Sequence, residues 1–262
     1  MTRIILNADD FGKSSTRNRA IDDSFKQGLI CSAGLIVTGK HLQEAVDLMF
    51  KGDYVDHIHL HFNLSANLLQ EDSEDAPLTD AIRLDPFFCK DGQFRPYKGL
   101  PRSFSSIRKW RSVYREMAAQ FELFKSVTKE RANYKHIDFH LWYNLTWPVS
   151  IALNVFSLRY HIRSVRVIGI HQKSILRYRV LSALSWNVRV KYIPATNIDY
   201  FLSKRSSFEN TPVLELYCHP NYKEGVFLDD SPSYLGHDRQ PMNDQITKLK
   251  SLGYSFISWE KV

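Results

Sequence analysis

Short apolar runs alternate with amphipathic stretches along this chain, and that pattern predicts strands followed by helices. Residues 3–8 predict a short buried strand, and residues 16–27 predict a helix. The same pair recurs in residues 29–39 and 41–50. In residues 55–65, polar and apolar side chains alternate with a period of two, which predicts a third strand.

The second half of the chain continues this alternation. Residues 105–131 predict the longest helix, because large apolar side chains recur there every three or four positions. The elements predicted after it are strand, helix, strand, helix, strand, helix and strand, in residues 134–141, 148–158, 162–170, 173–186, 211–220, 243–251 and 254–259.

One long polar stretch, residues 66–102, interrupts the alternation and is interpreted as an insertion or lid. Within it, Asp91 and Gly92 stand between aromatic side chains, and an Asp-Gly pair favours the tight turn of a hairpin. We therefore expect a small hairpin inside the insertion.

Strands that alternate with helices predict an α/β fold with a mainly parallel sheet, here of about seven strands. The leading architecture is a (β/α) barrel, regular or irregular, formed by residues 1–262 as one domain. A doubly wound open sheet is the alternative. Both architectures place their chemistry at the carboxyl ends of the strands, where loops bring distant side chains together.

Composition excludes several classes of protein. Hydrophobic residues make up 44% of the chain and charged residues 24%, which is typical of a globular protein and not of a disordered one. No apolar run approaches the ~18 residues of a membrane-spanning helix, and polar residues stand too early for a secretory signal, so we expect a cytoplasmic protein. Three cysteines without CxxC spacing argue against a disulfide framework and a cysteine zinc site.

The formal net charge of +7 is concentrated in residues 159–191, which contain eight Lys or Arg and no Asp or Glu, a local charge of +8. Such a stretch suits an anionic membrane surface, an acidic substrate or plain solvent. Residues 173–186 have the basic amphipathic pattern of peripheral membrane contact, although an ordinary barrel helix has the same pattern. Nucleic acid is not expected, because no nucleic-acid-binding motif accompanies the charge.

Acidic and imidazole side chains gather where the predicted strands end. They are Asp9 and Asp10 after the first strand, His59 and His61 in the third, His136, Asp138 and His140 in the fourth, and Glu215 and His219 in the late one. Taken singly, each has a structural explanation, such as a helix cap for Asp10 or an arginine partner for Asp138. Parallel strands, however, point all of them at one rim.

Adjacent carboxylates at a buried rim need a cation or hydrogen-bond donors, because isolated charges there would neutralise through a pKa shift. A divalent metal held by one carboxylate and two imidazoles would meet this need, with the second carboxylate accepting a proton from water. Neighbouring side chains on a strand point to opposite faces, so Asp9 and Asp10 face the same way only where the strand ends.

Four motifs carry a resemblance to a known family. NADDFG at residues 7–12 with the following Asn18, LHFNLS at 60–65, HIDFH at 136–140 and ELYCHP at 215–220 resemble the successive motifs of YdjC-like carbohydrate deacetylases, which include chitooligosaccharide deacetylase. The resemblance extends over most of the chain. It implies a (β/α) barrel variant, a Mg²⁺ or Zn²⁺ ion and an N-acetylated sugar as substrate.

The resemblance also implies roles for individual residues. Asp10, His61 and His140 would be the metal ligands, Asp9 the general base and His219 the general acid. Substrate contacts and orientation of the carboxylates are expected from a further set, namely Asn7, Asp138, Trp142, Arg166 and Glu215.

This chain departs from the family pattern at three positions. Trp142 and Asn144 stand where the family often continues its fourth-strand motif with two more histidines, and His59 stands where the family usually has glycine. The first two changes indicate either an altered sugar preference or a loss of activity. His59 would crowd the site or add a polar contact.

The sequence therefore predicts a metal-dependent hydrolase that removes an N-acetyl group from an amino sugar and releases acetate. Two alternatives stay open: a barrel that binds a glycan without cleaving it, and a metal hydrolase of another substrate class, such as phosphoesters, for which an Asp/His site is also suited. The oligomeric state is open as well, with a homodimer as one alternative.

Overall fold

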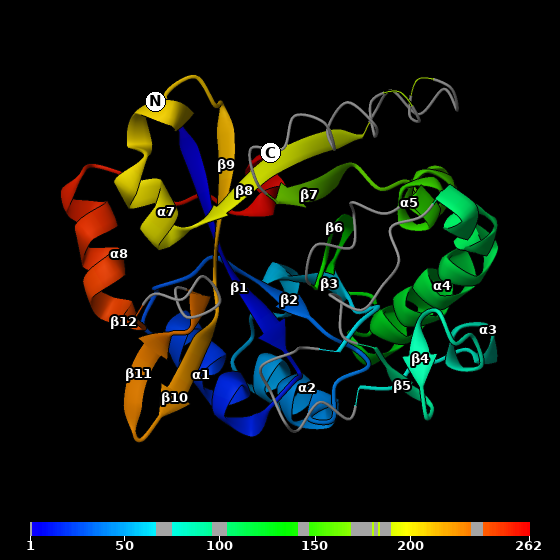
Figure 1. Cartoon of the computed structure of the whole chain (residues 1–262). Helices are drawn as coiled ribbons and strands as arrows, with labels where there is room; N and C mark the ends of the chain where they lie inside the picture. The colour runs from blue at the N-terminus through cyan, green and yellow to red at the C-terminus, as the bar shows by residue number, and fades with distance from the viewer. Residues whose placement is uncertain are drawn as a thin grey trace.

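Seven strands form a closed barrel in which every neighbouring pair is parallel, in the order β1-β2-β3-β6-β7-β8-β9 (Figure 1). The structure is a computed structural model that describes residues 2–66, 75–95, 104–140, 147–168, 180, 183, 190–231 and 238–262. The predicted (β/α) barrel is confirmed, and the open sheet is excluded because β9 pairs back with β1.

The barrel strands are largely buried, except toward the starts of β6 and β8, where residues are half-buried or exposed. Their bounds are β1 Arg3–Phe11, β2 Ser32–Leu35, β3 Ile58–Phe62, β6 Asn133–Phe139, β7 Ser164–Ile168, β8 Lys191–Asn197 and β9 Val213–Cys218. Strands buried on both faces need apolar side chains toward the helices, which leaves the inward positions to carry polar groups near the rim.

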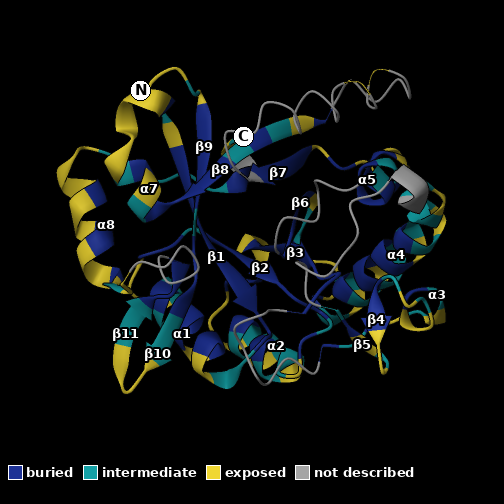
Figure 2. Ribbon diagram, in the orientation of Figure 1, coloured by how far each residue is buried: buried dark blue, intermediate teal, exposed yellow. Residues whose placement is uncertain are grey.

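Helices surround the barrel, with α4 and α5 side by side on one flank, α7 and α8 on the opposite flank, and α1 and α2 below (Figure 1). They are α1 Ser15–Lys26, α2 Leu42–Lys51, α3 Asp80–Arg83, α4 Trp110–Val127, α5 Trp147–Tyr160, α7 Ile198–Ser203 and α8 Met242–Ser251, with 3-10 turns η1 Val55–His57, η3 Phe104–Lys109, η5 Arg205–Phe208 and η7 Trp259–Lys261. Figure 2 shows buried residues along the barrel and exposed residues on the outer faces of the helices. None of the described helices is long and apolar enough to span a bilayer.

Two small antiparallel sheets lie outside the barrel. β4 Cys89–Lys90 and β5 Gln93–Phe94 form the hairpin predicted at Asp91 and Gly92, whose φ angles of 53° and 79° are those of a tight hairpin turn. The second sheet was not predicted and comprises β10 Pro220–Lys223, β11 Val226–Asp229 and β12 Gln240–Pro241, packed beside α1 (Figure 1).

One predicted strand is wrong. Residues 254–259 contribute only an isolated bridge between Phe256 and Ile4, with Ile257 N donating to Ile4 O at 2.8 Å. β2 pairs with β1 only from Asn7 onward, which leaves the start of β1 accessible on this side, and residues 254–259 form one bridge there instead of a strand. The seventh strand is instead β8, which the sequence obscures because it contains Pro194 and lacks regular alternation.

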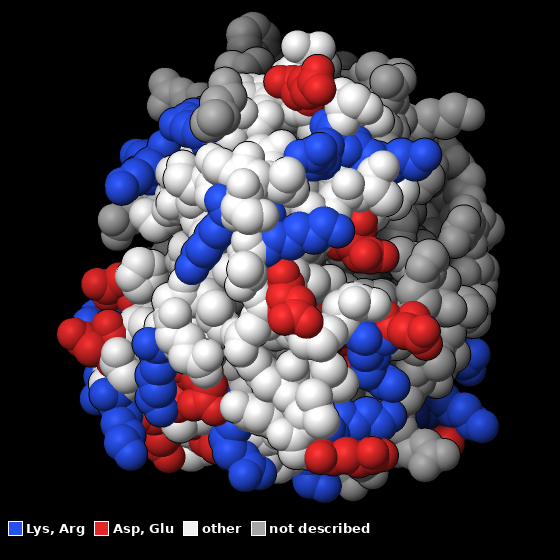
Figure 3. Space-filling model, turned by 90° about the vertical axis from the view of Figure 1, so that its left-hand side faces the viewer, with Lys and Arg blue, Asp and Glu red and all other residues white. Residues whose placement is uncertain are grey.

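Surface charge is mixed where Figure 3 shows it, with acidic and basic side chains interspersed over that face. The described members of the basic stretch 159–191 differ from one another: Arg166 is buried, whereas Arg159, Arg163 and Lys191 are exposed. The helix predicted at 173–186, and with it the expected membrane contact, falls largely outside the described residues.

Candidate active site

A bulge in β1 brings both carboxylates of the NADDFG motif to the barrel rim. Ala8 pairs with Ala33 and Phe11 with Leu35, so β1 has one residue more than β2 between these pairs. Asp10 takes the left-handed conformation, with φ at 70°. The strand thus continues past the aspartates instead of ending, and the bulge, not the strand end, breaks the alternation of side chains.

Three potential metal ligands converge at this rim, one from each of three strands or strand ends. Asp10, His61 and His140 each offer a ligand atom, and these atoms lie within 4.8 Å of one another. Asp10 Oδ1 is 2.8 Å from His140 Nδ1 and 3.5 Å from His61 Nε2. Asp10 is fully buried, yet neither of its carboxylate oxygens nor His61 Nε2 makes a well-aligned hydrogen bond. Buried atoms of this kind suit a divalent cation.

His61 is oriented from behind by Asp138. Its Nδ1 lies 2.6 Å from Asp138 Oδ1, which leaves Nε2 directed at Asp10. Burial disfavours the charged imidazole, but Asp138 and Asp9 outweigh burial and raise the pKa of His61 to about 10. A carboxylate behind a metal-binding histidine is the usual supporting arrangement. Gly34 leaves room for the ring, since a Cβ there would stand 3.0 Å from His61 Cβ.

Lys13 adds a cation to the same rim. Its buried Nζ lies 3.0 Å from His140 Nε2 and 3.9 Å from Asp10 Oδ2. Burial lowers the pKa of Lys13, and burial followed by the Lys13 charge lowers the pKa of His140 to about 4. A neutral imidazole is the form that binds a metal.

Asp9 is held by a bidentate ion pair with Arg166. Arg166 Nη1 and Nη2 lie 2.6 and 2.7 Å from the two carboxylate oxygens of Asp9, and Asn7 Nδ2 donates to Asp9 Oδ1 at 2.7 Å. This fork geometry fixes the carboxylate in both position and orientation. The expected orienting role of Asn7 agrees with this contact.

Arg166 joins Asp9 to two further carboxylates inside the barrel. Its Nε donates to Glu215 Oε1 at 2.8 Å, and its Nη2 lies 2.6 Å from Asp138 Oδ2. Burial alone would raise the pKa of Asp138, but Arg166 and His61 hold it well below the ordinary range. Burial dominates for Glu215 and raises its pKa to about 7. One guanidinium therefore bridges three buried carboxyl groups.

His59 adds a polar contact deeper in the barrel. Its Nε2 lies 3.1 Å from Asp138 Oδ2, and its Nδ1 lies 3.1 Å from Ser32 Oγ. The ring is completely buried and does not lie at the rim itself. Of the two effects expected from a histidine at this position, the structure shows the polar contact.

His219 approaches Asp9 from the end of β9. Its Nε2 is 3.9 Å from Asp9 Oδ2, and its Nδ1 is 2.9 Å from Ser231 Oγ, which in turn donates to Asp229 Oδ1 at 2.6 Å. The unpredicted β10–β11 hairpin brings Asp229 and Ser231 back beside β9. Burial lowers the pKa of His219, which Asp10 and Asp9 partly oppose.

The structure thus brings together nearly all the residues selected from the sequence. Asp9, Asp10, His61, His140 and His219 surround one rim, while Asn7, Asp138, Arg166 and Glu215 support it from within the barrel. Their catalytic and substrate-binding roles stay predictions. Trp142 and Asn144 lie outside the described residues.

Sequence reasoning missed Lys13, Asp229 and Ser231. Lys13 directly follows NADDFG in the sequence, and this position could have indicated that the lysine lies beside the proposed metal site. The other two residues had no comparable signal, because they approach His219 only through the folding of the small sheet.

Comparison with known families gives a match over most of the chain. A family model described as YdjC-like protein matches residues 3–244. The chain is 26% identical over 231 residues to carbohydrate deacetylase 2 of Listeria innocua serovar 6a, covering 87% of this chain and 84% of that protein. It is 23% identical over 232 residues to a carbohydrate deacetylase of Clostridium beijerinckii, covering 87% and 85%.

A solved structure has the same fold. It is that of an Enterococcus faecalis protein proposed to cleave cellobiose phosphate, with a TM-score of 0.67 and 17% identity, covering 99% of this chain and 98% of that chain. At this level of identity the likeness bears on the barrel and its connections.

Proposed function

The chain belongs to the YdjC-like protein family, and on that premise we propose that it is a metal-dependent hydrolase that removes the N-acetyl group of an amino sugar and releases acetate. The observation that carries the proposal is the convergence of Asp10, His61 and His140 beside an Asp9 that Arg166 holds in place. The relatives named carbohydrate deacetylase support the same reaction and substrate class.

Asp10, His61 and His140 would hold the ion. Two imidazoles and one carboxylate suit Zn²⁺ better than Mg²⁺, because magnesium prefers oxygen ligands. When bound, a divalent ion at such a site lowers the pKa of water and polarises a carbonyl oxygen. Asp138 supports His61 from behind and directs its Nε2 toward the site, where the ion would take the place of the Nε2 proton.

Asp9 is suited to accept the proton of the attacking water. Its carboxylate is fixed on both oxygens by Arg166 and on one by Asn7, so its remaining acceptor capacity points in a defined direction. Fixed geometry of this kind lowers the entropic barrier of the proton transfer.

His219 is suited to return a proton to the departing amine. Its Nε2 lies 3.9 Å from Asp9 Oδ2, so the two groups can act on the two ends of one amide bond, His219 at the nitrogen and Asp9 at the water that attacks the carbonyl carbon. Ser231 and Asp229 hold the opposite side of the ring. An amine leaves poorly unless it is protonated, so this transfer completes the cleavage of the amide and yields acetate and an amino sugar.

Acetate release from N-acetylglucosamine oligomers, monosaccharides and glycolipids tests the proposal, together with the bound metal content. Asp9→Asn should keep the ion and lose roughly 10²- to 10⁴-fold in turnover, as expected for loss of a general base. Asp10→Asn should lose both the ion and turnover. Asp244→Asn, an exposed residue on α8, is the matched control and should behave as wild type.

Two outcomes would contradict the proposal. Wild-type turnover in Asp9→Asn would remove Asp9 from the reaction, and full metal content in Asp10→Asn would remove Asp10 from the ligand set. Metal binding without acetate release from any of these substrates would favour the glycan-binding alternative.

A further inference from the structure

A second group of potential metal ligands lies inside the barrel, deeper than the rim. His59, His136 and Asp138 each offer a ligand atom, and these atoms lie within 4.8 Å of one another. His59 belongs to β3 and the other two residues to β6, the neighbouring strand. All three side chains are buried. Two imidazoles and a carboxylate form a donor set that suits Zn²⁺.

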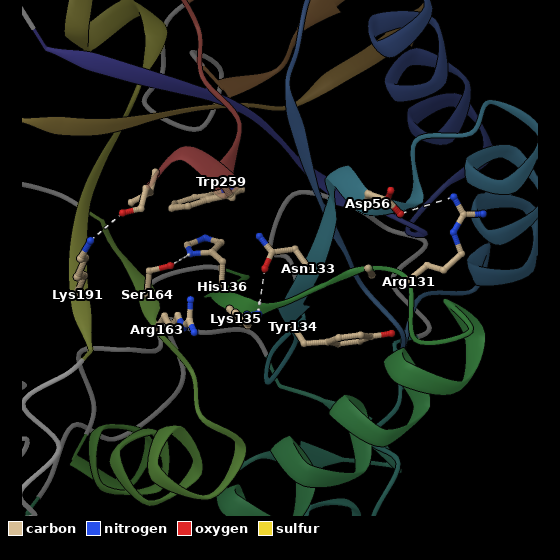
Figure 4. A pocket seen from close by; sticks show the side chains of 12 residues that line it. Asp56, Arg131, Asn133, Tyr134, Lys135, His136, Arg163, Ser164, Lys191 and Trp259 are labelled. Carbon is tan, nitrogen blue, oxygen red and sulfur yellow. Dashed lines mark hydrogen bonds and ion pairs between the residues drawn. The ribbon is translucent and has the colours of Figure 1, made fainter.

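A serine hydroxyl stands behind each of the two imidazoles. Ser32 Oγ donates to the main-chain oxygen of His57 at 3.2 Å, so it is left to accept a proton from His59 Nδ1, 3.1 Å away. Ser164 Oγ lies 3.0 Å from His136 Nδ1 (Figure 4). A ring whose Nδ1 donates to such a partner has Nε2 as its metal-binding atom.

Both Nε2 atoms face carboxylates. His59 Nε2 lies 3.1 Å from Asp138 Oδ2. His136 Nε2 lies 3.9 Å from Glu215 Oε2, which is too far for a hydrogen bond. Both atoms of this second pair are buried, and neither makes a hydrogen bond with the part of the chain that the structure describes. Buried polar atoms are seldom left unpaired, so a cation between the four atoms would satisfy them together.

The spacing of these atoms suits an ion between them. Zinc binds imidazole nitrogen and carboxylate oxygen at ~2.1 Å, so two atoms of a tetrahedral ligand set lie about 3.4 Å apart. The 3.1 Å and 3.9 Å separations of the two pairs lie on either side of this value. A site with four protein ligands has no open position for water or substrate, which is typical of a structural zinc ion.

Arg166 is a cation in contact with this group, but it does not balance the negative charge. Its guanidinium contacts Asp9, Asp138 and Glu215, which carry three negative charges when ionised. Even with an imidazolium at His61, these groups keep a net negative charge. Arg166 Nε donates to Glu215 Oε1 and leaves Oε2 for an ion. Asp138 Oδ2 would be shared, because a carboxylate oxygen has two lone pairs.

A pocket opens toward this group from the amino-terminal end of the barrel. It has a volume of about 940 Å³, and His136, Ser164 and Trp259 are part of its lining (Figure 4). The Trp259 ring stacks on His136 with ring centroids 3.3 Å apart, which fixes the imidazole in place. The pocket gives an ion a route toward the interior that does not pass through the candidate active site.

We propose that the barrel interior binds a second, structural Zn²⁺ ion through four side chains: His59, His136, Asp138 and Glu215. The two carboxylates match the double charge of the ion, which takes the place of the proton between His59 and Asp138. Asp138 joins the two sites, with Oδ1 facing His61 and Oδ2 facing the interior ion. The site does not depend on the proposed deacetylation.

Counting the zinc ions bound per chain tests the proposal. The full chain is stripped with a chelator and titrated with Zn²⁺ at pH 8 in competition with a chromogenic chelator. Wild type should bind two ions. Asp10→Asn should lose the rim ion and keep the interior one, whereas His136→Gln should lose the interior ion and keep the other. Asp10→Asn/His136→Gln should bind none.

Two variants made in the Asp10→Asn background report on the interior site alone. Asp10→Asn/Ser164→Ala keeps the His136 ring and removes the hydroxyl behind it, so it should bind zinc roughly tenfold more weakly than Asp10→Asn. Asp10→Asn/His57→Gln removes an exposed imidazole close to His59 in the chain and is the matched control. It should bind zinc as Asp10→Asn does.

The pattern of losses separates this site from the rim site. One ion in wild type that Asp10→Asn loses and His136→Gln keeps would overturn the interior site and leave the proposed function intact. One ion with the reverse pattern would support the interior site and contradict the rim ligands. Equal affinities of Asp10→Asn and Asp10→Asn/Ser164→Ala, or an equal loss in the His57 control, would also overturn the proposal. Melting curves of the metal-free variants confirm that each is folded.

Discussion

The two ends of the barrel handle charge in opposite ways. At the carboxyl end, buried carboxylates, imidazoles and cations contact one another. The single side chain of Arg166 contacts three carboxyl groups, those of Asp9, Asp138 and Glu215. At the amino end, Lys135 and Arg163 face an open pocket without acidic partners among the described residues.

This difference follows from burial. Removing a charge from water is unfavourable unless partners replace the lost hydration, so charges inside the barrel must be balanced by the protein itself. Exposed charges keep their hydration and can stay unpaired. The comparison therefore separates buried charges that need protein partners from exposed charges that water stabilises.

The largest effect is expected where a buried charge loses its partner. Arg166→Met leaves Asp9, Asp138 and Glu215 facing one another, and should lower the free energy of unfolding by about 3–5 kcal/mol. Urea denaturation measures this loss. Arg163→Gln, three residues earlier, removes an exposed charge and should leave the unfolding midpoint near that of wild type. Equal unfolding midpoints for the two variants would contradict the claim that buried charges depend on their partners more than exposed charges do.

A smaller effect concerns Lys13 and the metal. Its ammonium is 3.0 Å from His140 Nε2 and 3.9 Å from Asp10 Oδ2, so it repels a divalent cation at the same rim. Lys13→Met should raise the affinity for Zn²⁺ by about tenfold, as the loss of one repulsive charge at close range predicts. Competition with a chromogenic chelator measures this change without reference to turnover.

Lys26→Met is the matched control for Lys13. Lys26 lies on α1 and is largely exposed, with its Nζ 2.5 Å from Asp22 Oδ2. Its replacement should leave zinc affinity unchanged. If the zinc affinity of Lys13→Met is no higher than that of Lys26→Met, the charge of Lys13 does not influence the proposed metal ligands.

The smallest effect concerns His136, which lies between the two ends. Burial first, and then the charge of His59, lower its pKa well below the ordinary value, while Asp138 opposes and Arg166 adds to this shift. The unfolded chain therefore binds a proton near pH 6.5 that the folded chain does not bind, so His136 makes the folded state less stable as pH falls. The change is at most about 1.4 kcal/mol per pH unit.

Unfolding free energies of wild type and His136→Gln between pH 8 and pH 5 would measure this contribution (roughly the window set by the reference histidine pKa). Glu215, with its pKa raised to about 7, contributes to the pH dependence with the opposite sign. Because Glu215 is present in both proteins, the difference between the two curves reports mainly on the histidine. Relative to the variant, wild type should lose stability as pH falls. Parallel curves would contradict the assignment.

Most of the fold could be predicted from local patterns. Periodicity located six of the seven barrel strands and the hairpin at Asp91, because each depends on side chains close in sequence. The seventh strand was misplaced, since Pro194 hides β8 and residues 254–259 resemble a strand but form a single bridge to β1. Pairing depends on which edges are free, and local periodicity carries no such information.

The candidate site was predictable in its residues and not in its connections. The sequence placed Asp10, His61 and His140 at strand ends, and the barrel brings them within contact. It did not show that Arg166 holds Asp9, or that Ser231 holds His219. Such contacts depend on long-range register and loop folding.

The sequence by itself determined the alternation of strands and helices and the kinds of side chain at the strand ends, because both are properties of neighbouring residues. Only the tertiary structure decided that the Lys13 ammonium lies beside His140 and that Arg166 contacts Asp9, Asp138 and Glu215. Barrel closure sets these neighbours, since it fixes the register between strands that lie far apart in the chain.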